Sequence, residues 1–184
     1  MENVLVFVSI IVGLGVADIL VSFQRLLRAR KLVRWDWAAL IVALLALLVL
    51  VQSWWSIAQP GAKTMTIGAF LPTLVELILL FLLASATLPD EVPSGGVDLR
   101  AYYQEQGSYI WTLFAGALAW LMATEIVTAL PRLGIAGAFA LKAEEFIVLA
   151  VMISLIFVRA RWWHAIGLIL LAGGPIGWLS RSLG

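Results

Sequence analysis

Residues 37–55 read WAALIVALLALLVLVQSWW, a run of mostly apolar residues that carries no charge and has tryptophan at both ends. About 20 such residues are enough for a helix to cross the hydrocarbon core of a bilayer. Indole rings favour the headgroup level, where the apolar ring and its N–H are both accommodated. The stretch therefore predicts a transmembrane helix with one membrane boundary near Trp37 and the other near Trp55.

Most of the chain has the same character. Of its 184 residues, 63% are hydrophobic and 12% are charged, against about 45–50% and about 25% in a typical soluble domain. The mean hydropathy is +1.04. We expect an all-α fold, a single polytopic membrane domain of six helices at residues 4–23, 37–55, 67–88, 109–130, 141–158 and 162–179. Residues 89–108, which begin with the turn-rich PDEVPSGG, form the only sizeable soluble segment.

The composition also argues against several classes of function. A net charge of +1 does not favour nucleic acid as a partner. The absence of cysteine removes thiolate nucleophiles and thiolate metal sites. The single histidine, His164, lies at a predicted membrane boundary, where we expect a solvated anchor rather than a metal ligand. We expect no metal, no cofactor and no enzymatic activity, because no nucleophile–base arrangement is recognisable.

Basic residues near the ends of spans predict how the spans are oriented in the membrane, because such residues are more frequent on the cytoplasmic side. The connection after the first span carries five of them, namely Arg25, Arg28, Arg30, Lys31 and Arg34. We therefore expect this connection and residues 89–108 to lie in the cytoplasm. Both termini are then expected on the outer side of the membrane.

Carboxylates occur in four of the six predicted spans, at Asp18, Glu76, Glu125, Glu144 and Glu145. A carboxylate inside a membrane is costly unless it faces protein or water, so it marks by default a pathway or a binding site. Glu76 is close to the middle of its span, one helical turn after Pro72. Proline leaves the carbonyl of Gly68 without its helical partner, and a free carbonyl beside a carboxylate suits a cation or proton site.

Each carboxylate also has a structural interpretation. Asp18 shares a helix face with Ser22 and Arg25, which predicts a hydrogen-bonded anchor. In the structural interpretation, Glu76 is a protonated acid that is hydrogen-bonded to a neighbouring helix. Glu125 lies beside a row of small and hydroxyl residues at four-residue spacing that predicts a close helix–helix contact, namely Thr112, Gly116, Trp120, Thr124 and Thr128.

Three basic residues are possible partners of these acids, namely Arg25, Arg132 and Lys142. Lys142 and Glu145 are three residues apart, a spacing at which helical side chains can pair. Glu144 is then left to meet Arg132, or to join Glu125 and Glu76. Whether the acids of different helices converge is left open by the sequence.

Several short motifs follow one another along the chain, and their order is the basis of a resemblance. These are GLG at 13–15, RLLR at 25–28, RWDW at 34–37, QSWW at 52–55 and DLRAYY at 98–103. The chain resembles a group of small, uncharacterised six-span proteins of the bacterial inner membrane, over residues 1 to about 130. The resemblance implies the architecture, a bacterial source and an inner-membrane location, and it implies no role for any residue.

We expect a small channel or transporter that moves protons or small cations and that forms a homo-oligomer in the lipid bilayer. The five carboxylates would line the route, since they outnumber the basic residues within the spans. The alternative is a non-catalytic assembly subunit that binds lipid or a partner protein, with the acids as structural anchors. A lipid-directed enzyme with Glu125 and Glu144 as paired acids ranks last.

Overall fold

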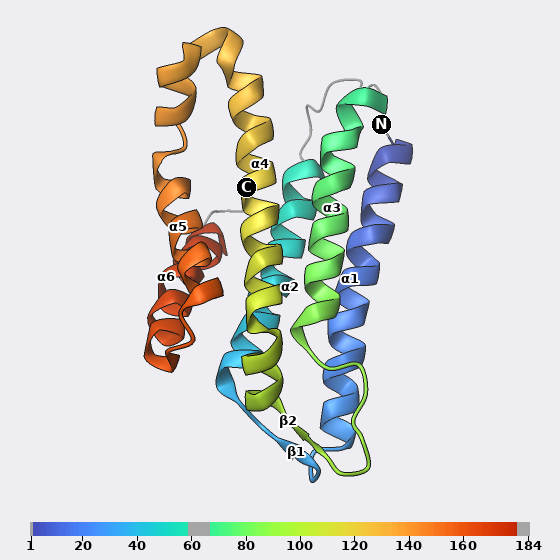
Figure 1. The fold of residues 1–184 in the computed structure, drawn as a ribbon. Helices are drawn as coiled ribbons and strands as arrows, with labels where there is room; N and C mark the ends of the chain where they lie inside the picture. Colours follow the sequence, from blue (N-terminus) through green and yellow to red (C-terminus); the bar gives the residue numbers. More distant parts are fainter. Residues whose placement is uncertain (1, 59–66, 180–184) are drawn as a thin grey trace.

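A computed structural model describes residues 2–58 and 67–179 of the chain (Figure 1). The elements are α1 (Glu2–Arg28), β1 (Val33–Arg34), α2 (Trp37–Ala58), α3 (Ile67–Thr87), β2 (Val97–Asp98), α4 (Leu99–Ala140), α5 (Ala143–Phe157) and α6 (Arg161–Leu179). The two strands have only two residues each. The predicted all-α class is therefore confirmed.

Four helices contain a stretch long and apolar enough to cross a membrane, at Val4–Arg28, Trp37–Ala58, Phe70–Thr87 and Leu99–Ala140. α5 has 15 residues, or about 22 Å of helix, whereas the hydrocarbon core is about 30 Å thick. α6 is not among the four either. The structure thus supports a membrane protein with four candidate spans in its described part, and the count of six is not confirmed.

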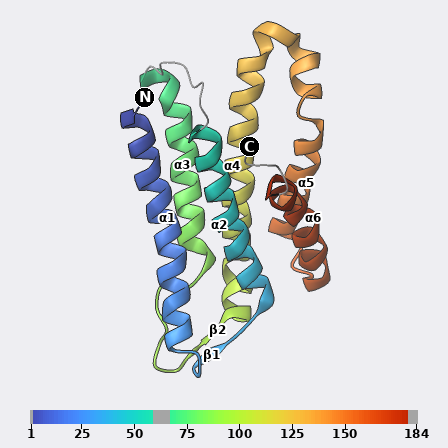
Figure 2. The same ribbon diagram turned by 180° about the vertical axis from the view of Figure 1, so that it is seen from behind.

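Helices α1 to α4 run side by side, while α5 packs against α4, and α6 packs against α2 and α5 (Figures 1 and 2). Gly15 lets α1 approach closely, since a Cβ atom there would lie 3.2 Å from Leu50 on α2 and 3.5 Å from Ala84 on α3. Large apolar side chains, such as Ile10 at 56% exposed, cover the outside of the bundle. In a membrane protein, lipid covers such side chains.

One end of the bundle, which we call the basic end, contains the α1–α2 and α3–α4 connections. Here β1 pairs in parallel with β2, and the Val97 N–H donates to the Leu32 carbonyl at 2.9 Å. Asp98 accepts from the backbone N–H of Arg100 at 2.9 Å and so caps α4. The second half of the segment expected to be soluble is therefore the start of α4, which continues without interruption into the predicted fourth span.

Gly96 is required by this strand pair. Its φ of +88° is in the left-handed region, and a Cβ atom would lie 2.4 Å from the Leu32 carbonyl oxygen. We expect Gly96→Ala to lower the free energy of unfolding by at least about 1–2 kcal/mol, the typical cost of that conformation for an L-residue. Gly95 has open space around it, so Gly95→Ala is the matched control. Equal thermal unfolding of both variants in detergent would contradict the prediction.

The α4–α5 hairpin departs most from expectation. The fourth span is expected to end at residue 130, but α4 continues through Pro131 to a kink at Gly134, where φ is 66° and ψ is 178°. The chain reverses direction there, and the tip extends beyond the neighbouring ends of α1 and α3 (Figures 1 and 2). The descending arm, residues 135–157, is helical except for a break at Leu141 and Lys142. Stacked rings of Phe139 and Phe146, with centroids 6.0 Å apart, bridge the break.

Candidate functional site

Two cavities lie among α2, α4, α5 and α6. The larger, the acidic cavity, has a volume of about 650 Å³ and carries Glu125, Lys142, Glu144 and Glu145 in an otherwise mostly apolar wall. The smaller, the basic pocket, has a volume of about 230 Å³, and its charged wall residues are Asp36, Arg100, Arg159 and Arg161. The basic pocket is at the basic end of the molecule, where α4 and α6 begin.

The charges of the acidic cavity are grouped around Lys142. Its ammonium contacts the Glu125 carboxylate of α4 and lies 3.0 Å from Glu145 Oε1 on α5. Lys142 is located at the helix break, with its side chain 13% exposed. Glu144 and Glu145 occupy the first turn of α5, where the helix dipole favours negative charge. The wall thus combines three carboxylates with one ammonium group.

Glu76 is held between α2 and α3 instead. The hydroxyl of Ser53 donates to Glu76 Oε1 at 3.1 Å, and Glu76 is not part of the wall of either cavity. One turn away, the indole N–H of Trp120 donates to the Pro72 carbonyl at 2.8 Å. This bond joins α4 to α3 and explains a tryptophan in the middle of a span. Both contacts match the structural interpretation of this region as a helix–helix interface.

Asp18 is separate from the other acids. Ser22 and Arg25 were expected to share its face, but both bind Asp90 in the α3–α4 connection, at 3.5 Å to the carboxylate and 2.5 Å to the carbonyl. Within the described segments, Asp18 has no hydrogen-bond or ion-pair partner, and Arg132 has no ion-pair partner. The structure therefore brings together Glu125, Glu144, Glu145 and Lys142, and leaves Asp18, Glu76, Arg25 and Arg132 elsewhere.

A buried hydrogen-bond network separates the two cavities. The Trp111 indole N–H donates to the Tyr103 hydroxyl at 2.9 Å, and this hydroxyl is 2.7 Å from His164 Nδ1. His164 Nε2 lies 2.8 Å from the Val158 carbonyl, which can only accept. The neutral histidine with its proton on Nε2 therefore satisfies every group, since Nδ1 then accepts from Tyr103. Trp111 lines the acidic cavity, while Tyr103 and His164 line the basic pocket.

The burial of His164 corrects one expectation. His164 is 8% exposed, so it is not a solvated anchor at a membrane boundary, and Trp111 beside it is fully buried. The sequence contains no signal that predicts the contact between Tyr103 and His164, because these two residues are 61 positions apart. Their contact depends on the packing of α6 against the other helices.

Asp36 is the buried carboxylate of the basic pocket, at 6% exposed. One oxygen accepts from the Ala38 N–H at 2.9 Å and so caps α2, and the other accepts from Arg161 at 2.6 Å. The Arg161 guanidinium also lies 5.7 Å from the centre of the Trp37 ring. Sequence reasoning missed this site, although RWDW at 34–37 and RWW at 161–163 both place arginine and tryptophan at a predicted span start.

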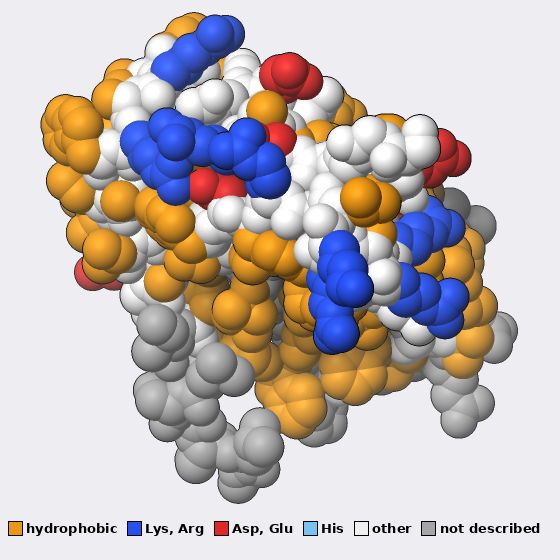
Figure 3. All heavy atoms as spheres, turned by 90° about the horizontal axis from the view of Figure 1, so that it is seen from below, with side chains coloured by type: hydrophobic (Ala, Val, Ile, Leu, Met, Phe, Trp, Pro, Cys, Tyr) orange, Lys and Arg blue, Asp and Glu red, His pale blue; other side chains and the backbone are white. Residues whose placement is uncertain are grey.

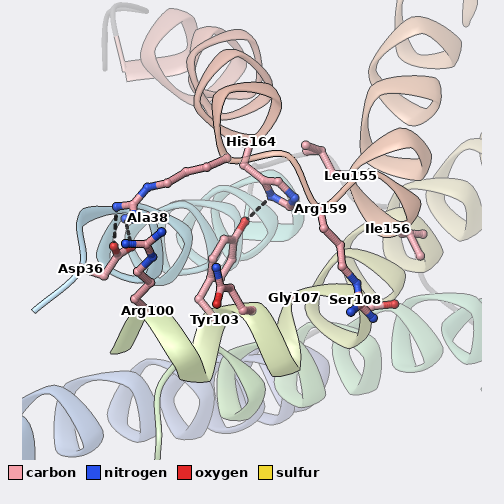
Figure 4. Close-up of a pocket in the computed structure, with 12 residues that line it drawn as sticks. Asp36, Ala38, Arg100, Tyr103, Gly107, Ser108, Leu155, Ile156, Arg159 and His164 are labelled. Atoms are coloured by element: carbon pink, nitrogen blue, oxygen red, sulfur yellow. Dashed lines mark hydrogen bonds and ion pairs between the residues drawn. The ribbon is translucent and has the colours of Figure 1, made fainter. Parts of the chain in front are cut away.

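Arg100 and Arg159 complete the basic pocket from α4 and from the α5–α6 connection. Figure 4 shows Tyr103 and His164 between these two arginines, with the Asp36 ion pair on the Arg100 side. Neither arginine has a carboxylate partner in residues 2–58 and 67–179. Arginines without a partner at a pocket wall are suited to bind an anion.

No protein-family model, curated protein or solved structure matches the chain. The part of the chain that the structure describes also contains no group of three or more His, Asp or Glu side chains placed to hold a metal ion.

Proposed function

We propose that the protein is a transporter of the bacterial inner membrane that moves protons or a small cation through the acidic cavity. The observation that supports this most is the group of Glu125, Glu144 and Glu145 around Lys142 in the wall of that cavity. Such charges are costly inside a membrane unless they face protein or water. With three carboxylates against one ammonium, the wall attracts positive charge.

A transporter fits this arrangement better than a channel. A channel requires a continuous route, whereas here the Trp111–Tyr103–His164 network lies between the two cavities. Many transporters bind ions where a membrane helix is interrupted. Lys142 lies at such an interruption of residues 135–157, an arm of about 34 Å that is long enough to cross the hydrocarbon.

The basic end is proposed to lie in the cytoplasm, with both termini outside. Figure 3, which views this end directly, shows several groups of Lys and Arg side chains over it. Such an excess of basic residues is typical of the cytoplasmic side. The bacterial inner membrane follows from the resemblance described above.

The decisive experiment is proton and monovalent-cation flux into liposomes that contain the purified protein. We expect Glu125→Gln to lower the flux at least tenfold, because it removes a charge from the cavity wall. Glu105→Gln makes the same change at an exposed position of the same helix and should leave the flux unchanged. Glu76→Gln should also preserve the flux, since glutamine can still accept the Ser53 hydrogen bond.

Equal flux in wild type and Glu125→Gln would contradict the role of the acidic cavity. No flux in the wild type would contradict transport and favour the alternative, a membrane assembly subunit. One observation supports that alternative. The hairpin tip extends beyond α1 and α3 and exposes Leu133 at 52% and Ile135 at 73%, a surface available to a partner helix or a second copy.

A further inference from the structure

The basic pocket carries an excess of positive charge that its own residues do not neutralise. Its wall contains Arg100, Arg159 and Arg161 against the single carboxylate of Asp36. That carboxylate is already engaged by Arg161 and by the first turn of α2. Arg100 and Arg159 are therefore the two guanidinium groups of the pocket left available to a ligand, within the described residues.

The chemistry of the wall matches an anion with several oxygen atoms. A guanidinium group presents a planar set of N–H donors that binds phosphate in a bidentate manner. Figure 4 shows Arg159 beside Ser108 on one side and Arg100 on the other, so donors approach the pocket from two directions. At about 230 Å³ the pocket is smaller than the roughly 300–1,000 Å³ of sites for drug-sized ligands. It suits a phosphate-sized group.

The position of the pocket relates it to the membrane. Trp37 begins α2 at 40% exposed and Trp162 is in the first turn of α6 at 65% exposed. Exposed indoles favour the headgroup level of a bilayer. Beside the pocket, Phe157 is 77% exposed and Val158 40% exposed, which provides an apolar surface for acyl chains. Basic pockets between membrane helices on the cytoplasmic side bind anionic headgroups.

We propose that the basic pocket binds the phosphate group of an anionic phospholipid, with Arg100 and Arg159 as the residues whose positive charge holds it there. Arg161 adds positive charge while it remains bound to Asp36. The site is independent of the transport proposal, because it uses neither the acidic cavity nor its carboxylates. A soluble phosphate has the same recognition chemistry and is the other source of ligand to distinguish.

The test is calorimetric titration of the protein in neutral detergent micelles with short-chain phosphatidylglycerol, short-chain phosphatidylcholine or inorganic phosphate. We expect phosphatidylglycerol to bind the wild type at least tenfold more tightly than either of the others. The double variant Arg100→Gln/Arg159→Gln should weaken this binding at least tenfold. Both side chains are exposed, so the variant is expected to fold, and its thermal unfolding without ligand checks this.

The matched control is Arg28→Gln/Arg30→Gln, which removes two exposed charges from the basic end outside the pocket. It should bind phosphatidylglycerol like the wild type. If both double variants lose affinity equally, or neither loses any, the pocket is not the site and the proposal is wrong. If inorganic phosphate binds as tightly as the lipid, and only Arg100→Gln/Arg159→Gln abolishes it, the phosphate site is supported and the ligand is a soluble phosphate.

Discussion

Trp111→Ala is expected to lower the free energy of unfolding by about 3–5 kcal/mol, the usual cost of truncating a large buried aromatic side chain. Trp111 is fully buried, its ring stacks on Phe114 with centroids 5.3 Å apart, and its indole N–H bonds to Tyr103. The variant also removes the side chain between the acidic cavity and the basic pocket. In liposomes that show transport, we therefore expect an increased passive leak of ions.

Two further variants separate the contribution of ring packing from that of the hydrogen bond and provide an exposed control. Trp111→Phe retains most of the ring packing and loses one hydrogen bond, so we expect a loss of only about 1 kcal/mol. Trp162→Ala removes a tryptophan that is 65% exposed and should be close to neutral. The free energies are measured by titration of the protein from mild detergent into denaturing detergent. If Trp111→Ala unfolds like Trp162→Ala, the buried network does not hold α4 and α6 together.

Properties that depend on neighbouring residues could be predicted from the sequence. The helix at 37–55 follows from apolar length alone, and the structure extends it only to Ala58. The contact of Lys142 with Glu145 follows from their spacing on the chain. The carboxylate partner across the hairpin, Glu125, required the reversal at Gly134, which a glycine after a proline permits but does not specify.

Contacts between distant segments could not be predicted in this way. Asp36 and Arg161 are 125 residues apart, and their meeting depends on where α6 packs against α2. The same packing buries His164, which the sequence pattern placed at a solvated boundary. Hydropathy describes how a segment partitions into lipid, and it contains no information on which helix faces which neighbour. The basic pocket was missed for that reason.

The second large expected effect is the loss of stability when the Asp36–Arg161 ion pair is removed. Asp36→Ala removes the cap of α2, worth about 0.5–2 kcal/mol, and the hydrogen bond to a charged partner, worth about 1.5–3 kcal/mol. We expect a combined loss of about 2–5 kcal/mol in the free energy of unfolding, measured by the same detergent titration. Asp36→Asn can retain the cap and should lose the ion pair alone.

A double-mutant cycle of Asp36→Asn with Arg161→Met isolates the pair. We expect the double variant to be about 0.5–3 kcal/mol more stable than the sum of the single losses predicts, since residues in direct contact couple by that amount. Arg34→Met provides the control, because its ion pair with Asp98 at 3.1 Å involves an arginine side chain that is 85% exposed, and exposed pairs contribute little. Additive losses for Asp36 and Arg161 would mean that the ion pair does not couple α2 to α6. In that case α6 would be held on the bundle by its packing, by the His164 network and by the hydrogen bond from the Trp163 indole to the Ser154 hydroxyl.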